Sequence, residues 1–338
     1  MSESGDYNPG PWKGHDFASA RKTYDAYVGR SYSDAVSGGK ATKDLIPESI
    51  STDSTAPIII VIDETGSMGD WPATIFSKLP YLENEGKEYL GEDFEIAFMA
   101  IGDAHNGEKY PLQVRPFAKG LELKDRLKEL VIEGQGGSQT YETYELAGLY
   151  SLLKVNIPKA IKPILIFIGD ESAYDDVDRD QAKELVGVDL EKALPTQALF
   201  DKLKEKYSVY LIRKPYGSGY SRSDSNTMSD LDKRIVAQWE KLVGVDHIAH
   251  LPKAERVVDV IFGIFAKETG RVAYFENELE DRQLKDKDGD KKIDMVYKSL
   301  KTIHNITDAK REAGKHTGKP VMKRVDPIDP SKEVKPLI

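Results

Sequence analysis

Two aspartates stand where an apolar run gives way to polar residues. Asp63 follows one β-branched run and Asp170 follows another, while Thr65 and Ser67 come at alternate positions after Asp63. Carboxylate and hydroxyl oxygens are hard ligands of the kind that Mg²⁺ prefers. Either aspartate alone fits the cap of a following helix equally well. Two carboxylates at neighbouring strand ends, however, repel each other unless a cation lies between them, so the combination predicts a divalent-metal site.

The apolar runs also predict the elements that position these residues. Continuous β-branched runs indicate strands buried on both faces of a sheet. We predict strands at residues 58–62, 94–101, 112–117 (a return strand), 164–168, 207–212 and 247–251. We predict one helix that begins at Asp70, and four more that span about 121–131, 143–153, 231–242 and 254–268. This alternation predicts an α/β fold: a doubly wound, mostly parallel central sheet with one antiparallel strand and helices on both faces. Ligand sites in such sheets lie at the carboxyl ends of the strands.

The patterning divides the chain into three parts. Residues 57–270 carry all the predicted strands and form one domain. Residues 1–56 show no sustained periodicity and are expected to be a poorly structured N-terminal arm or linker. Residues 271–338 are expected to be a C-terminal extension with a short helix and a basic, proline-containing tail.

Composition excludes several classes of function. The 338 residues carry 48 Lys and Arg against 57 Asp and Glu, a net charge of −9, which disfavours nucleic-acid and anionic-membrane partners. The absence of cysteine excludes disulfides, zinc–thiolate sites and iron–sulfur clusters. The first residues show no secretory signal, and each apolar run is shorter than the roughly 20 residues that span a bilayer. We therefore expect a cytoplasmic protein.

The segment Asp63-Glu64-Thr65-Gly66-Ser67-Met68 resembles a known motif. It is similar to the DxSxS metal-ion-dependent adhesion site (MIDAS) of von Willebrand factor A (VWA) domains, in the form DxTGSM. The resemblance covers residues 57–270 and includes a glycine-rich loop before a helix and a strand that ends in Asp170. It implies a Rossmann-like VWA fold, as in the integrin I domain, with one bound Mg²⁺, Mn²⁺ or Ca²⁺. Thr65 and Ser67 would coordinate through their hydroxyls, and Asp63 and Asp170 mainly through bound water.

The resemblance implies one more ligand, from the glycine-rich loop of residues 135–147. Counting back five positions from Ala147 gives Glu142, a residue type that integrin β-type relatives use there. Counting from the two glycines gives Ser138 instead, and Thr140 lies between the two. The register stays open among Glu142, Thr140 and Ser138.

The family's function implies protein–protein interaction without catalysis. A partner's Asp or Glu side chain commonly completes the metal coordination in this family, and intracellular relatives work beside AAA+ ATPases or within multiprotein assemblies. The alternative is a Mg²⁺-dependent hydrolase, a phosphatase of the haloacid dehalogenase type, which also begins with a strand that ends in Asp. That chemistry needs a second acid two residues later, where this chain has Thr65. A third reading is a purely structural fold with an empty site.

Further polar segments have simpler interpretations. The acidic stretch after Asp170 consists of Glu171, Asp175, Asp176, Asp178 and Asp180. It fits the N-terminus of a helix. If these residues ringed the metal instead, they would repel an acidic partner. Asp103 and His105 fit a hairpin loop better than the rim of the site. Residues 286–297 resemble a calcium loop but lack its glycine and its final glutamate, which favours a solvated turn.

Overall fold

A six-stranded sheet forms the centre of the computed structural model, which describes residues 41–131, 140–216, 228–285 and 287–304. All neighbouring strands are parallel except the pair β3 and β4. The mostly parallel sheet with one antiparallel strand is therefore confirmed. In spatial order the strands are β12 (Ile248–His250), β11 (Ser208–Arg213), β7 (Ile164–Gly169), β2 (Pro57–Asp63), β3 (Glu95–Ile101) and β4 (Leu112–Val114).

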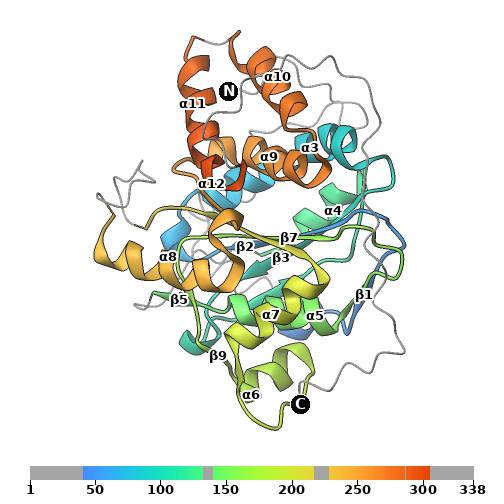
Figure 1. Cartoon of the computed structure of the whole chain (residues 1–338). Coiled ribbons are helices and arrows are strands. Elements are labelled where there is room, and N and C mark those ends of the chain that lie inside the picture. The colour runs from blue at the N-terminus through green and yellow to red at the C-terminus, as the bar shows by residue number, and fades with distance from the viewer. Residues whose placement is uncertain (1–40, 132–139, 217–227, 286, 305–338) are drawn as a thin grey trace.

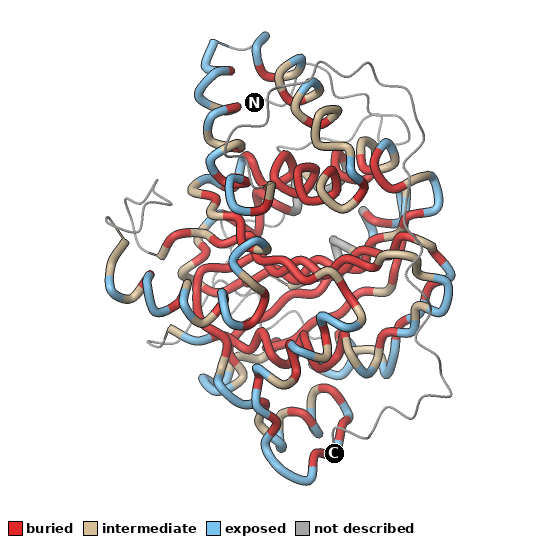
Figure 2. The backbone as a smooth tube through the Cα atoms, viewed as in Figure 1, coloured by how far each residue is buried: buried red, intermediate tan, exposed pale blue. Residues whose placement is uncertain are grey.

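Helices cover both faces of this sheet, as the sequence predicts (Figure 1). On one face lie α3 (Trp71–Leu90), α4 (Glu122–Lys128) and α9 (Val257–Thr269). On the other lie α5 (Tyr144–Leu153), α7 (Thr196–Lys206) and α8 (Asp230–Val243). The side chains of β2 alternate between the two cores, so the whole strand is buried (Figure 2). This burial explains the continuous apolar run, because a strand covered on both faces has no solvent side.

Residues 41–56 belong to the folded body, although the sequence predicts a poorly structured arm there. The turn η2 (Thr42–Leu45) buries Leu45, and β1 (Ile50–Ser51) pairs with β6 (Val155–Asn156). Single apolar residues anchor this segment, which is why it shows no periodicity. Residues 1–40, the rest of the predicted arm, lie outside the described residues.

The chain beyond Gly270 holds more helix than the one short helix predicted. It forms α10 (Val272–Gln283), α11 (Gly289–Ser299) and α12 (Lys301–His304), which lie next to α9 in Figure 1. Their apolar faces share the core of the domain, and Leu300 packs so closely on α9 that a Cβ at Gly263 would lie 2.2 Å from it. The predicted basic tail, residues 305–338, lies outside the described residues.

Short elements surround the carboxyl edge of the sheet. The strand β5 (Tyr141–Glu142) pairs with β8 (Ser172–Ala173), and β9 (Asp176–Val177) pairs with β10 (Leu194–Pro195). In the acidic stretch, Asp178 caps the short helix α6 (Arg179–Gln181), which continues as a π-helical turn (Ala182–Val186). In the calcium-like segment, Asp286 lies outside the described residues. Residues 287–288 precede α11, and residues 289–297 lie within it. No helix in the described ranges is both long and apolar enough to cross a membrane.

Candidate metal centre

Asp63 and Asp170 meet at the carboxyl edge of the sheet. Asp63 is the last residue of β2 and Asp170 follows β7, and these two strands are hydrogen-bonded neighbours with Ile62 opposite Ile168. Both aspartates are almost fully buried. The parallel topology therefore brings together two residues that are more than one hundred positions apart in the sequence.

The two hydroxyl residues connect these aspartates. The Thr65 hydroxyl and backbone N–H donate to Asp63 Oδ1 at 2.6 and 2.9 Å, and the Ser67 hydroxyl donates to Asp170 Oδ1 at 2.8 Å. The Thr65 and Ser67 hydroxyl oxygens lie 3.2 Å apart. Either hydroxyl can donate to the other or to its carboxylate, and each oxygen keeps lone pairs at this point. A cation can coordinate such lone pairs.

Tyr144 also holds Asp63, and the sequence analysis did not identify it. Its hydroxyl donates to Asp63 Oδ2 at 2.7 Å from the first turn of α5. The ring passes directly over Gly169, where a Cβ would lie 1.8 Å from the tyrosine hydroxyl oxygen. Only glycine at the end of β7 permits this contact. No residue pattern predicts this hydrogen bond, because it depends on how α5 packs against the sheet.

Lys214 is the second residue that sequence reasoning missed. It follows β11, the neighbour of β7, and its Nζ donates to Asp170 Oδ2 at 2.6 Å and to the carbonyl of Ser67 at 2.7 Å. A signal existed, since the rule that places Asp63 and Asp170 at the carboxyl edge applies equally to Arg213 and Lys214, the two residues after the predicted strand 207–212.

Two buried glutamates also lie at this edge. Glu142 and Glu171 are buried, and the Oε2 atom of each has no hydrogen-bond partner among the described residues. Burial, with repulsion from Asp63 and Glu171, raises the pKa of Glu142 to about 12. Burial and repulsion from Asp63 also raise the pKa of Glu171 to about 8, although a hydrogen bond with Glu142 opposes this. Burial and Asp170 raise the pKa of Asp63 to about 6.

The three candidates for the additional ligand lie in different places. Glu142 lies close enough to Asp63 for their charges to interact. The Thr140 carbonyl accepts from the Ser172 N–H, and Thr140 lines a cavity of about 680 Å³ together with residues of α7 and α8. Ser138 lies outside the described residues. The structure therefore associates Glu142 more closely with the predicted ligands than Thr140.

Asp103 lies close enough to Glu142 for their charges to interact, whereas the sequence favours a hairpin loop over the rim of the site for this residue. It is buried, accepts a hydrogen bond from the Tyr174 hydroxyl at 2.9 Å, and contributes to the raised pKa of Glu142. Its side chain also accepts from the His105 N–H, as loop aspartates often do. His105 is exposed, with its ring 4.0 Å from that of Tyr174.

The donor set fits a hard divalent cation. In the described part of the chain, no three acidic or histidine side chains converge as a preformed metal site. The centre instead combines two carboxylates with two hydroxyl oxygens, and the unpartnered Oε2 atoms of Glu142 and Glu171 lie in the same acidic region. Buried acidic oxygens without donors are costly unless a proton or a cation neutralises them.

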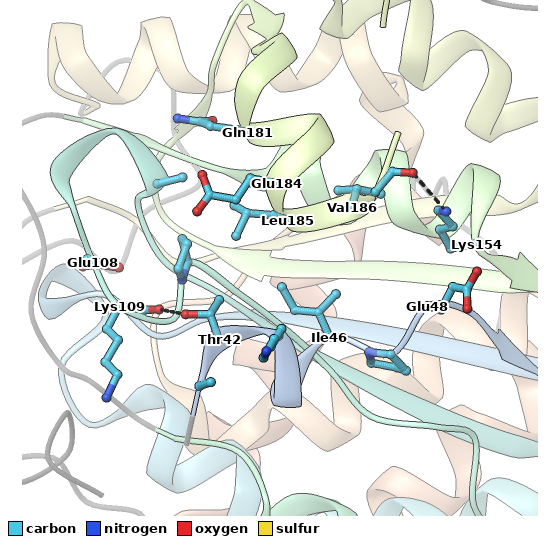
Figure 3. Close-up of a pocket in the computed structure, with 16 residues that line it drawn as sticks. Thr42, Ile46, Glu48, Glu108, Lys109, Lys154, Gln181, Glu184, Leu185 and Val186 are labelled. Atoms are coloured by element: carbon cyan, nitrogen blue, oxygen red, sulfur yellow. Dashed lines mark hydrogen bonds between the residues drawn. The ribbon is translucent and has the colours of Figure 1, made fainter. Parts of the chain in front are cut away.

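A larger cavity lies away from the predicted ligands. It measures about 730 Å³ and is lined by residues of the segment 41–48, the β3–β4 loop and the π-helical turn, together with Lys154 (Figure 3). Thr42 donates to the Lys109 carbonyl and Lys154 to the Gly187 carbonyl across its walls. Its lining mixes lysines and glutamates, so it favours no single class of ligand.

Comparison with known proteins adds little. No protein-family model matches the chain, and no curated protein matches it. Among solved structures, the pilus adhesin SpaC from Lactobacillus rhamnosus GG in its open conformation is similar, with 10% identity and a TM-score of 0.44 over 67% of this chain. A second structure of SpaC shows 13% identity and a TM-score of 0.40 over 69%. This chain spans 31% of the length of either adhesin chain. Similarity at this level defines no function for the chain.

Proposed function

We propose that the chain is a divalent-metal-dependent protein–protein interaction module, a VWA domain with a MIDAS-type site. One observation carries the proposal. Asp63, Thr65, Ser67 and Asp170 form a single hydrogen-bonded network at the carboxyl edge of the sheet, with two hydroxyl oxygens 3.2 Å apart. The parallel strands closed by one antiparallel edge strand also agree with the fold that the motif implies.

The residues of this network would hold the ion in defined roles. Thr65 and Ser67 offer hydroxyl oxygens, and Asp63, Asp170 and Glu142 offer carboxylates. A bound Mg²⁺ supplies positive charge and an open position for an oxygen from outside the chain. Tyr144 and the Thr65 backbone N–H fix the orientation of the Asp63 carboxylate.

Metal dependence follows from the charge at this edge. The carboxyl groups of Asp63, Asp170, Glu142 and Glu171 lie there, and Lys214 donates to one of them, Asp170. Asp63 and Asp170 repel an approaching Asp or Glu of a partner. A divalent cation reverses the local sign, so a partner that uses an acidic side chain is expected to bind only to the metal-loaded protein.

Calorimetric titration of EDTA-stripped protein with Mg²⁺ tests this proposal. We expect Thr65→Val to weaken binding by about tenfold or more, since it removes a ligand and a donor to Asp63. Thr269→Val is the matched control, because Thr269 is also buried but its hydroxyl donates to the Phe265 carbonyl in α9. Equal affinity in wild type and Thr65→Val would contradict the proposal.

A hydrolase assay gives an independent test. The haloacid dehalogenase alternative requires an acid two residues after Asp63, and the structure has the Thr65 hydroxyl donating to Asp63 at that position. We expect no Mg²⁺-dependent turnover of p-nitrophenyl phosphate. Turnover that Asp63→Asn abolishes would replace the interaction module by an enzyme.

A further inference from the structure

Lys214 binds a carboxylate that a cation at this centre would use, that of Asp170. Its Nζ lies 2.6 Å from Asp170 Oδ2 and 2.7 Å from the Ser67 carbonyl oxygen. Asp170 Oδ1 accepts from the Ser67 hydroxyl, so both oxygens of Asp170 already have donors from this chain. A metal ion that draws on Asp170 must therefore share it with a positive charge or displace that charge.

The position of Lys214 makes displacement feasible. Its side chain is 16% exposed, whereas that of Asp170 is fully buried, so the ammonium reaches the carboxylate from the rim of the site. Lysine has a flexible four-carbon stem and a compact charge that water hydrates strongly. The lysine can withdraw to solvent, while Asp170 cannot follow it.

We infer that Lys214 is a tethered counter-ion, which neutralises Asp170 in the metal-free protein and competes with the divalent cation for it. This inference rests on the proposed function, because it concerns the affinity of that same site. Two opposite effects follow. Lys214 stabilises the metal-free fold by balancing a buried carboxylate, and it weakens metal binding because like charges repel strongly at short range in a buried site.

Variants that remove the charge separate these effects. In Lys214→Met, we expect stripped protein to unfold at a lower temperature than wild type, and Mn²⁺ to bind about tenfold more tightly or better. Lys214→Gln serves as a second neutral variant if the methionine impairs folding. Lys214→Arg keeps the charge and is expected to stay near wild type. Lys233→Met is the matched control, since Lys233 forms an exposed pair with Asp230 on α8.

Thermal unfolding of stripped protein and calorimetry with Mn²⁺ measure both quantities on the full chain. Tighter Mn²⁺ binding together with a lower unfolding temperature supports the inference. Equal or weaker Mn²⁺ binding in both neutral variants overturns the competition but leaves the metal function standing. Absence of Mn²⁺ binding in wild type and in every variant overturns the proposed function, and the competition with it.

Discussion

Two consecutive cations at the end of β11 serve different regions of the molecule. Arg213 forms an ion pair with Asp232 of α8, and both side chains are 1% exposed. Asp232 also accepts from the Tyr216 N–H and the Ser229 hydroxyl, and Ser229 in turn caps α8. Lys214 instead reaches Asp170 from the rim of the site, in a region where acidic groups outnumber cations.

The difference shows which buried charges are structural. Around Asp232, the protein supplies a donor to each carboxylate oxygen and one full opposite charge, although Nε and Nη1 of Arg213 have no hydrogen-bond partner among the described residues. Around Asp63 and Asp170, Lys214 contacts one carboxylate, and the charge of Arg213 also acts on Asp170. The Oε2 atoms of Glu142 and Glu171 have no donor among the described residues. Carboxyl oxygens without donors, and not burial itself, distinguish the candidate site.

The largest effect is expected in the balanced region. Arg213→Met leaves Asp232 buried without its counter-ion, which should lower the free energy of unfolding by about 3–5 kcal/mol. Urea unfolding measures this change. Arg234→Met, an exposed position on α8, is the control and should change stability by no more than about 0.5 kcal/mol. A loss for Arg213→Met no larger than that of the control would show that this pair contributes nothing structural.

The same region should also make the fold sensitive to acid through His250, which lies opposite Arg213 in the sheet. Burial, and then the charge of Arg213, lowers the pKa of His250 from 6.5 to about 4. The unfolded chain binds the proton that the folded chain excludes, so stability falls as the pH drops from about 6.5 to 4. The full shift corresponds to up to about 3 kcal/mol.

His250→Gln should reduce this loss of stability, which urea unfolding at pH 7 and pH 4.5 can measure. His247→Gln is the control, because that ring pairs with Asp246 at the surface. An identical pH dependence in wild type and His250→Gln would show that the fold does not keep His250 neutral.

The smallest effects concern the additional metal ligand. Glu142→Gln should weaken Mg²⁺ binding by about tenfold, since it removes a carboxylate near Asp63. It should leave the stability of stripped protein nearly unchanged, because Glu142 is protonated at pH 7 with a pKa of about 12. Thr140→Val should not change Mg²⁺ affinity, as Thr140 lines a different cavity. Calorimetry on both variants shows whether Glu142 or Thr140 is the additional ligand. Weaker Mg²⁺ binding in Thr140→Val, with unchanged binding in Glu142→Gln, would favour Thr140.

The sequence predicts the sheet and part of the site because both depend on local signals. Continuous apolar runs mark the buried strands, and the residue after each run lies at the carboxyl edge. Lys214 follows the same rule, but nothing in the sequence shows that its ammonium turns toward Asp170 while Arg213 turns toward α8. The contact of Tyr144 with Asp63 requires Gly169 at the end of β7, which the residues around Tyr144 do not indicate.

Other features are set by tertiary packing. Residues 41–56 are held by isolated contacts such as the burial of Leu45 and the pairing of β1 with β6. The helices α10–α12 complete a core whose other side is α9, so their apolar faces are recognisable only once that partner is known. Glu142 and Thr140 are only two residues apart, and the paired strands β5 and β8 determine which of them lies near Asp63.

The central claim is that this acidic edge binds one divalent cation. Electron paramagnetic resonance of Mn²⁺ added to EDTA-stripped protein counts bound ions directly, in wild type and in Asp63→Asn. Asn keeps the shape of the buried side chain and removes its charge. The account predicts one bound Mn²⁺ per wild-type chain and none in Asp63→Asn under the same conditions. No bound Mn²⁺ in wild type, or equal binding in both proteins, would contradict it.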